Sequence, residues 1–466
     1  MEFDLAGIGQ SPLLAAWILI KYLGIPIFLI LGFFGGRILW LNWRQNKFSS
    51  KLKYILLALD IPKENEQSPK AIENMFDQIS GAHSTISFID KWWGGKYQAK
   101  FSFEIISISG YIQFLVYTEE KFRDLVEAAV YAQYPDAEIT EIDDYVENSP
   151  KEFPNEEYNL WGSEFIETNK DVSPIQTYPF FEHTLSQEFK DPMAALMEIL
   201  SSLKKGENVW IQYVVTMEGF GWVKRCKAEI NKIVGKNNGM GGGFFSKISK
   251  FFSDFISEIA GQISGSPRSM ERKENERDEP LMYKLTPGEL EIVKAIENKM
   301  GKIGFNVKMR LIYFAPNDVY SPARSVSATV GAIKQFSGPF NGLKPESKRT
   351  RTKKLLFFAK KRLASRQRKI LNAYKERSNY LGVGDGFILN SEELATIFHF
   401  PDSTAVKTPL VKKVESKKFE APTNSRLFDN VIARRNDEAI PRIGDFIYGI
   451  ASLRSQRQNL YIKILC

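Results

Sequence analysis

LLAAWILIKYLGIPIFLILGFFGGRILWL, residues 13–41, is a nearly uninterrupted apolar run. A transmembrane helix needs about 20 mainly apolar residues, so this run can cross a bilayer once but is too short to cross it twice. Lys21 and Arg37 fall within the run, and near its ends such long side chains can reach the lipid–water interface. Trp40 and Trp43 follow at the level of an interfacial aromatic belt. The run therefore predicts one transmembrane helix.

Charges on either side of this predicted helix, residues 13–43, indicate its direction. The preceding residues, 1–12, carry acids and no base. Several bases lie at the other end, namely Arg37 within the helix and Arg44, Lys47, Lys51 and Lys53 after it. The positive-inside rule then predicts a short extracytoplasmic N-terminus and a single-pass protein of the inner membrane, with the bulk of the chain in the cytoplasm. A cleaved signal peptide is one alternative, but a basic n-region and a small-residue cleavage site are not evident. A buried core helix is the other, and such a long run is rare in soluble domains.

Composition indicates a globular protein with one anchor. The chain has 466 residues, enough for two or three domains after the anchor. Its two cysteines, Cys226 and Cys466, show no pairing pattern, which suits a reducing compartment. The net charge of +8 is concentrated in residues 346–377, where thirteen bases and two acids give +11, so the rest of the chain carries a charge of -3.

Residues 50–147 alternate between strand-like and helix-like periodicity and form the first predicted domain. The expected elements are a strand at 51–61, a helix at 68–80, paired strands at 96–109 and 111–118, a helix at 119–134 and a strand at 137–145. This βαββαβ order predicts a split βαβ, or ferredoxin-like, plait.

Residues 158–345 repeat the alternation and form the second predicted domain. The expected elements are strands at 165–169 and 177–184, a helix at 191–203, a strand at 208–217, helices at 222–234 and 286–300, a strand at 304–315 and a helix at 320–336. We therefore expect an α+β fold, with one transmembrane helix, two ferredoxin-like plaits and a basic helical C-terminal region.

A glycine-rich and polar insertion, residues 236–282, interrupts the second domain and carries a predicted amphipathic helix over 244–260. The apolar face of that helix is formed by Phe244, Ile248, Phe251, Phe252, Phe255, Ile256 and Ile259. Insertion of this face into the membrane interface is the favoured interpretation. Docking on a partner protein and packing on the chain's own core are the alternatives.

The region 346–424 is predicted to be basic, helical and extended. Its candidate phosphate-binding residues are Lys348, Arg349, Arg351, Lys353, Lys354, Lys360, Lys361, Arg362, Arg366, Arg368 and Lys369. Bases at this density favour contact with a nucleic-acid backbone, and such binding weakens steeply with salt. A strip held against anionic lipid and a solvated helix face with an apolar side in the core are the alternatives.

No residue pattern predicts catalysis. The three histidines, His83, His183 and His399, are isolated and lack companions at metal-ligand spacing. Residues 141–144 hold three acids, for which a solvated turn is the expected explanation because no glycine-containing calcium loop accompanies them. The chain contains neither a GxSxG elbow nor a GxxxxGK[ST] phosphate loop. We therefore predict no enzymatic activity, no cofactor and no metal.

Several segments together resemble a known family. They are YAQYPDAEITEIDDY at 131–145, KDPMAALMEILSSLKKGENVWIQYVV at 190–215, the basic stretch, and FILNSEELATIFHFPDSTAVKTPLVKKVESKKFEAPTN at 387–424. These segments are similar to the N-terminal, membrane-anchored accessory region of conjugation and type IV secretion DNA-translocating ATPases. Residues 394–401 and 408–424 are the most specific part, and the resemblance covers about residues 50–424.

The resemblance implies a role without a motor of its own. In that family a RecA-like motor follows, but here only residues 425–466 remain, an atypical tail. Two hypotheses would account for this difference: a motor gene interrupted after the accessory region, or a motor-less paralogue. We expect a membrane accessory that positions DNA or a separate motor ATPase, with lipid, DNA, that motor and further copies of the chain as partners. A lipid-binding and protein-binding scaffold without a nucleic-acid role is the alternative, and an enzyme of unknown chemistry ranks last.

Overall fold

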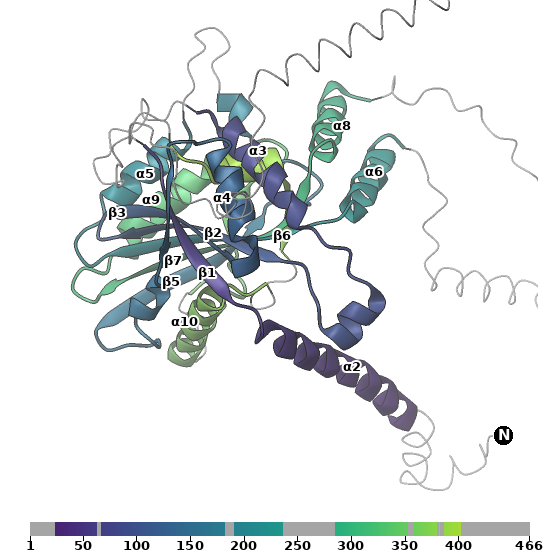
Figure 1. Ribbon diagram of the computed structural model, residues 1–466, viewed down its shortest axis with the longest axis horizontal. Coiled ribbons are helices and arrows are strands. Elements are labelled where there is room, and N and C mark those ends of the chain that lie inside the picture. Colours follow the sequence, from purple (N-terminus) through teal and green to yellow (C-terminus); the bar gives the residue numbers. More distant parts are fainter. Residues whose placement is uncertain are drawn as a thin grey trace, which may run out of the picture. The chain divides into compact units, whose positions relative to one another are not determined.

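The computed structural model describes residues 24–62, 67–181, 191–235, 285–352, 358–379, 382 and 386–401 (Figure 1). Several predicted features lie outside these residues: the first part of the transmembrane helix, the amphipathic helix at 244–260, Lys353 and Lys354, and the tail at 425–466. The chain is α+β, as predicted, with one apolar N-terminal helix and a large antiparallel sheet.

The apolar helix, α2, spans Ile25–Ser49. It contains a stretch, Ile27–Ser49, whose 23 residues are long and apolar enough to cross a membrane, and none of the apolar window is buried against the protein. The helix continues through the basic residues to Ser49 and does not stop at the predicted residue 43. Lys and Arg are good helix formers, so a change from apolar to basic composition does not end a helix.

The first half of the sheet follows α2. Its regular elements are β1 (Tyr54–Asp60), α3 (Pro69–Ile79), β2 (Lys100–Ile108), β3 (Tyr111–Glu119), α4 (Arg123–Tyr131) and β4 (Glu138–Ile142). Short helical turns connect them: η3 (Ser80–Ala82), η4 (Asp90–Gly94), η5 (Glu120–Phe122) and η6 (Tyr145–Asn148). The βαββαβ element order matches the sequence prediction.

The second half uses the rest of the described chain. Its elements are β5 (Tyr158–Glu167), η7 (Tyr178–Phe181), α5 (Met193–Ser201), β6 (Asn208–Met217), α6 (Gly221–Ile233), α8 (Pro287–Met300), β7 (Gly304–Pro316), α9 (Pro322–Lys334), β8 (Leu343–Pro345), α10 (Ala359–Lys375), β9 (Phe387–Asn390) and α11 (Ser391–Ile397). The residues after 345 therefore add a strand and two helices to the folded unit.

One continuous sheet contains both halves. Its strand order is β4-β1-β3-β2-β6-β7-β5-β8, and β9 pairs with β7 beside β5. All of these pairs are antiparallel. The join between the halves is the pairing of β2 with β6, which runs from Lys100 opposite Thr216 to Ile108 opposite Asn208. The halves therefore share main-chain hydrogen bonds along the full length of two strands.

Alternating side chains place an apolar core on each face of the sheet. Phe101, Phe103 and Ile105 of β2 point into the larger core, which also takes in residues of α3, α4, α5, α9 and α11. Ile106 points into the smaller core, where Ile370 and other residues of α10 contact Trp210 and its neighbours. Figure 1 shows α10 on the opposite face of the sheet from α3, α4, α5 and α9.

The strand predicted at 177–184 is wrong. Tyr178–Phe181 instead forms the 3-10 turn η7, and the residues after 181 are outside the described chain. Pro179 has no N–H to donate to a strand ladder. Tyr178 is held by side chains, since its N–H donates to Thr396 Oγ1 at 2.9 Å and its hydroxyl to Glu73 Oε2 at 2.7 Å. Tertiary contacts to α11 and α3 therefore decide this conformation.

Candidate functional site

The loop between β8 and α10 carries the first of the predicted phosphate-binding bases. The carboxylate of Glu346 accepts the main-chain N–H groups of Lys348 at 2.8 Å, Arg349 at 2.6 Å and Thr350 at 2.8 Å. Burial alone would raise the pKa of Glu346, but these hydrogen bonds lower it below its ordinary value. An ionised, buried carboxylate therefore folds the loop into a tight turn.

In the sequence RTRT, residues 349–352, successive side chains point to opposite sides of the loop, so the bases lie on one side and the hydroxyls on the other. Thr350 and Thr352 are buried, whereas Arg349 and Arg351 are exposed. Thr352 Oγ1 accepts the N–H of Gly162 in β5 at 2.9 Å, and its own N–H donates to the Gly162 carbonyl at 2.9 Å. The loop thus continues along β5 beyond β8, with its bases turned outward.

Helix α10 supplies the predicted bases from Lys360 to Lys369 and consists mainly of strong helix formers. Gln367, Ile370, Leu371 and Tyr374 are buried on its inner face, at helical spacing. The exposed bases of α10 are Lys361, Arg362, Arg368 and Lys369, with Lys360 at the start of the helix. The helix sequence contains no aspartate or glutamate, so these bases have no acidic neighbour within α10.

Arg366 connects the loop to the helix. Its guanidinium donates to the carbonyl of Arg351 at 2.8 Å and to that of Lys348. These bonds hold the exposed bases of the loop against α10. The exposed members of both segments, which we call the basic surface, are Lys348, Arg349, Arg351, Lys360, Lys361, Arg362, Arg368 and Lys369.

The predicted site residues therefore fall into three groups. Eight form the basic surface, and Arg366 is partly buried and holds the loop in place. Lys353 and Lys354 lie outside the described residues, as do the predicted membrane-contacting residues Phe244, Ile248, Phe251, Phe252, Phe255 and Ile259.

Arg377, counted among the bases of this segment, is buried and unavailable to a ligand. Its guanidinium donates to Glu104 Oε1 at 2.9 Å and to Asp144 Oδ2 at 2.6 Å. Burial lowers the pKa of Arg377, but the charge of Glu104 and the bonds to Asp144 outweigh that effect and raise it above its ordinary value. The predicted solvated turn at 141–144 is wrong for Asp144, because its carboxylate pairs with this buried arginine.

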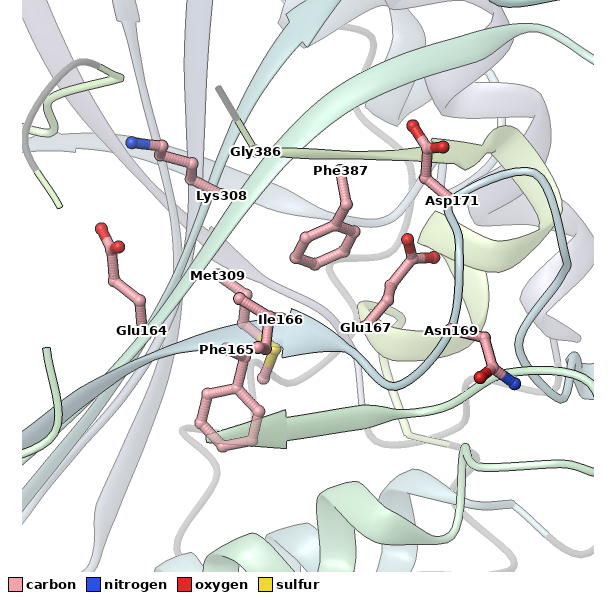
Figure 2. Close-up of a pocket in the computed structure, with 10 residues that line it drawn as sticks. All are labelled: Glu164, Phe165, Ile166, Glu167, Asn169, Asp171, Lys308, Met309, Gly386 and Phe387. Atoms are coloured by element: carbon pink, nitrogen blue, oxygen red, sulfur yellow. The ribbon is translucent and has the colours of Figure 1, made fainter. Parts of the chain in front are cut away.

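A pocket of about 270 Å³ lies between β5, β7 and the residue before β9. Figure 2 shows Glu164 and Lys308 at one end of it and Glu167, Asn169 and Asp171 at the other. Burial raises the pKa of Glu167 to about 9, against the opposing charge of Lys299. Glu167 is therefore a neutral carboxylic acid near pH 7, and its Oε1 accepts a hydrogen bond from Asn341 Nδ2 at 3.1 Å.

No catalytic arrangement is found among the described residues. No group of three or more His, Cys, Asp or Glu among them is suited to hold a metal ion. His399 is buried, and its ring nitrogens contact Asp191 Oδ1 and the Ala395 carbonyl, each at 2.9 Å. Burial raises the pKa of the Cys226 thiol to about 11, which disfavours the nucleophilic thiolate.

Comparison with family models gives a match that covers most of the chain and nearly all of the sheet. The family model described as Domain of unknown function (DUF8128) matches residues 58–413, which is more than half of the chain. The chain belongs to the DUF8128 family. A search of the curated proteins finds no match. The matched part of this DUF8128 protein begins within β1 and includes both halves of the sheet and the basic surface.

Two features of this DUF8128 protein were not predicted from its sequence. The first is the pocket around Glu167, whose residues come from β5, the loop after it, β7 and the start of β9. No local pattern brings such distant residues together. The second is an aromatic segment, FIDKWWGG at residues 88–95, which contacts α2. The segment contains two adjacent tryptophans followed by two glycines and has no regular helical or strand periodicity. This pattern was a signal that could have identified the aromatic segment.

Proposed function

We propose that this DUF8128 protein is a non-catalytic accessory of a DNA-transfer or type IV secretion-like apparatus. It would use its basic surface to position DNA, or a separate motor ATPase, at the inner membrane. The observation that carries this proposal is the basic surface itself, eight exposed bases on a loop and a helix that Glu346 and Arg366 hold in place. The resemblance to the accessory region of DNA-translocating ATPases supports the same conclusion.

The electrostatics of α10 favour an anionic ligand. Lys360, Lys361 and Arg362 occupy the first turn, which contains no acid and has no side-chain N-cap. The N-terminus of a helix carries partial positive charge, so three bases there destabilise the helix. Phosphate groups would relieve this repulsion and also accept hydrogen bonds from the bases.

Helix α2 supplies the membrane anchor in this proposal. Its apolar residues are not buried against the protein, so they would be exposed to water outside a membrane, and the helix is long enough to cross a bilayer. The bases after Gly36 favour a cytoplasmic location for the sheet and the basic surface, with the N-terminus outside. A single-pass protein of this orientation would hold DNA or a motor next to the inner membrane.

We also propose that each half of the sheet is a ferredoxin-like plait. The support is the strand order, since β4-β1-β3-β2 in one half is repeated as β8-β5-β7-β6 in the other. Each half also has a helix between its first two strands in the chain and another between its last two. In this description the two plaits associate through their second strands, and α6 and α8 flank the insertion of the second plait.

A second candidate function is a membrane scaffold in which the basic surface binds lipid. The observation that favours it is Phe358, which is 75% exposed and immediately precedes α10, two residues before Lys360. An exposed phenylalanine beside lysines is typical of interfacial segments that bind anionic membranes. The two functions share the same residues but differ in ligand.

A binding assay separates these functions. The full chain in detergent micelles is titrated with duplex DNA over a series of KCl concentrations, and with anionic vesicles after reconstitution. The test variant is Lys361→Glu/Lys369→Glu, and the matched control is Lys224→Glu/Lys227→Glu, which makes the same change at exposed positions of α6. Loss of DNA binding only in the test variant supports the accessory role. DNA binding that is equal in both variants, or absent at low salt, contradicts it.

A further inference from the structure

A second apolar surface lies next to α2, in a segment that the proposed function does not use. This aromatic loop, residues 88–95, contains η4. The side chains of Phe88, Ile89 and Trp93 are 70%, 71% and 59% exposed. The aromatic side chains of the loop pack against one another: the Phe88 ring lies 6.0 Å from that of Trp92 and 6.5 Å from that of Trp93. A grouped apolar surface of this kind indicates an interaction site.

Side-chain contacts hold the aromatic loop on α2. Trp40 Nε1 donates to the Trp92 carbonyl at 2.9 Å. The Arg37 guanidinium lies 4.7 Å from the centre of the Trp92 ring, a cation–π contact. Beyond the loop, the rings of Phe48 and Tyr97 meet edge to face at 5.7 Å. These contacts follow one side of α2 over about three turns.

Gly95 brings the main chain of the loop against the main chain of the helix. Its φ of +72° is a left-handed conformation that favours glycine. A Cβ atom at this position would collide with the carbonyl of Arg44 in α2, a backbone group that cannot move aside. Gly94 differs, because a Cβ there would meet only the side chains of Lys96 and Asp90 at 3.6 and 3.9 Å. Close docking on α2 therefore depends on Gly95 and not on Gly94.

The contacted part of α2 has the composition of a membrane interface. The Arg44 guanidinium lies 5.9 Å from the ring of Trp40 and 5.7 Å from that of Trp43, and Lys47 lies 5.5 Å from Trp43. Interleaved tryptophans and bases mark the level of the lipid headgroups, where aromatic rings and snorkelling side chains both gather. The aromatic loop is attached at this same level.

We propose that the aromatic loop is a second membrane contact, in which Phe88, Ile89 and Trp93 insert into the headgroup region of the leaflet at the C-terminal end of α2. The inference rests on the proposed anchoring by α2, with which the loop surface is continuous. Lys91 in the loop and Lys96 directly after it are exposed and suit anionic headgroups, although Lys96 also pairs with Asp90 at 2.8 Å. Two contacts at different points prevent the sheet from rotating freely about a single helix.

Fluorescence quenching by lipids tests this inference with the full chain reconstituted into vesicles of phosphatidylethanolamine and phosphatidylglycerol. Single cysteines carrying a bimane probe are placed at Ile89, at Leu31 in α2 and at Phe220, which is 83% exposed and belongs to another part of the chain. The background is Cys226→Ala/Cys466→Ser. We expect lipids with a doxyl group near the headgroup to quench the probe at residue 89, and lipids with a deep doxyl group to quench the probe at residue 31. The probe at residue 220 should stay bright.

The glycines provide matched variants. Gly95→Ala should abolish quenching at residue 89 and leave quenching at residue 31 intact, whereas Gly94→Ala should retain both. Quenching at 31 without quenching at 89 in the parent chain overturns the inference while α2 remains an anchor. Absence of quenching at both residues overturns the anchor as well. A probe at 89 that is shielded from a water-soluble quencher but unaffected by doxyl lipids overturns the inference in favour of a protein contact.

Discussion

Glu104 of β2 and Gln212 of β6 lie directly opposite each other at the middle of the strand pair that joins the two halves of the sheet. Gln212 Nε2 donates to Glu104 Oε1 at 3.0 Å, and both side chains are fully buried. Arg377 donates to the same carboxylate, and Arg310 Nη1 donates to Gln212 Oε1 at 3.0 Å. The junction between the halves therefore contains a buried polar network, which Arg310 and Arg377 complete from distant parts of the chain.

Replacing Arg377 with methionine should destabilise the fold by about 3–5 kcal/mol, because the Glu104 carboxylate would remain buried without its main cation. The measurement is urea unfolding of the detergent-solubilised chain followed by tryptophan fluorescence. Arg368→Met is the matched control, since Arg368 is exposed on the preceding helix and should change stability by less than about 0.5 kcal/mol. Equal effects of the two variants would contradict the importance of the network.

Glu167→Gln should make the stability of the protein less sensitive to a rise in pH between about 4.5 and 9. The pKa of Glu167 rises from its ordinary value of 4.5 to about 9 in the fold, chiefly by burial. The folded state therefore binds more protons than the unfolded state between these values, and stability falls as pH rises through this range. Thermal unfolding should show a higher midpoint for the variant than for the parent at pH 8 and a much smaller difference at pH 4. If the variant and the parent showed the same dependence of the unfolding midpoint on pH, Glu167 would not be the cause of the loss of stability at higher pH.

Arg366→Lys should weaken DNA binding although the net charge is unchanged. Lysine cannot donate to the carbonyls of Lys348 and Arg351 with the geometry of a guanidinium, so the loop would lose its fixed position against α10. We expect a loss of about 1 kcal/mol, or roughly fivefold in affinity, at constant salt. Arg368→Lys is the control, because Arg368 is an exposed member of the basic surface. Equal affinities for the two variants would show that fixing the loop is unimportant.

Gly162→Ala should loosen the attachment of α10 to the sheet. A Cβ at Gly162 would lie 2.9 Å from Ile370 Cγ2, so the helix must shift outward or the isoleucine must change rotamer. Overpacking of this kind costs typically about 1–3 kcal/mol, measurable by urea unfolding. Gly331→Ala is the control, since a Cβ at Gly331 in α9 meets nothing within 4 Å and alanine favours a helix. A stability loss confined to Gly331→Ala would contradict the packing argument.

The elements with strong local patterns were predicted with the greatest success. The strand predicted at 208–217 corresponds to β6, Asn208–Met217, and the helix predicted at 222–234 to α6, Gly221–Ile233. Side-chain period and capping residues act within a few residues, so they can be recognised in the sequence alone. The strand predicted at 177–184 failed because contacts with α3 and α11 outweigh a short apolar run.

Local composition also identified the basic segment but not the role of each base. Lys361 and Lys369 face solvent, whereas Arg366 binds loop carbonyls and Arg377 lies in the polar network. The sequence does not distinguish an arginine that binds a ligand from an arginine that stabilises the fold. Only the surroundings of each guanidinium distinguish them, and those surroundings come from strands far away in the chain.

By itself, the sequence determined the apolar helix at the N-terminus, the βαββαβ order of the first half and the position of the basic segment. These properties depend on residue type and spacing within short segments. Tertiary structure decided the pairing of β2 with β6, the pocket around Glu167 and the docking of the aromatic loop on α2. Each of these depends on contacts between residues separated by tens to hundreds of positions, for which main-chain hydrogen bonds and close packing select one arrangement among many with the same local pattern.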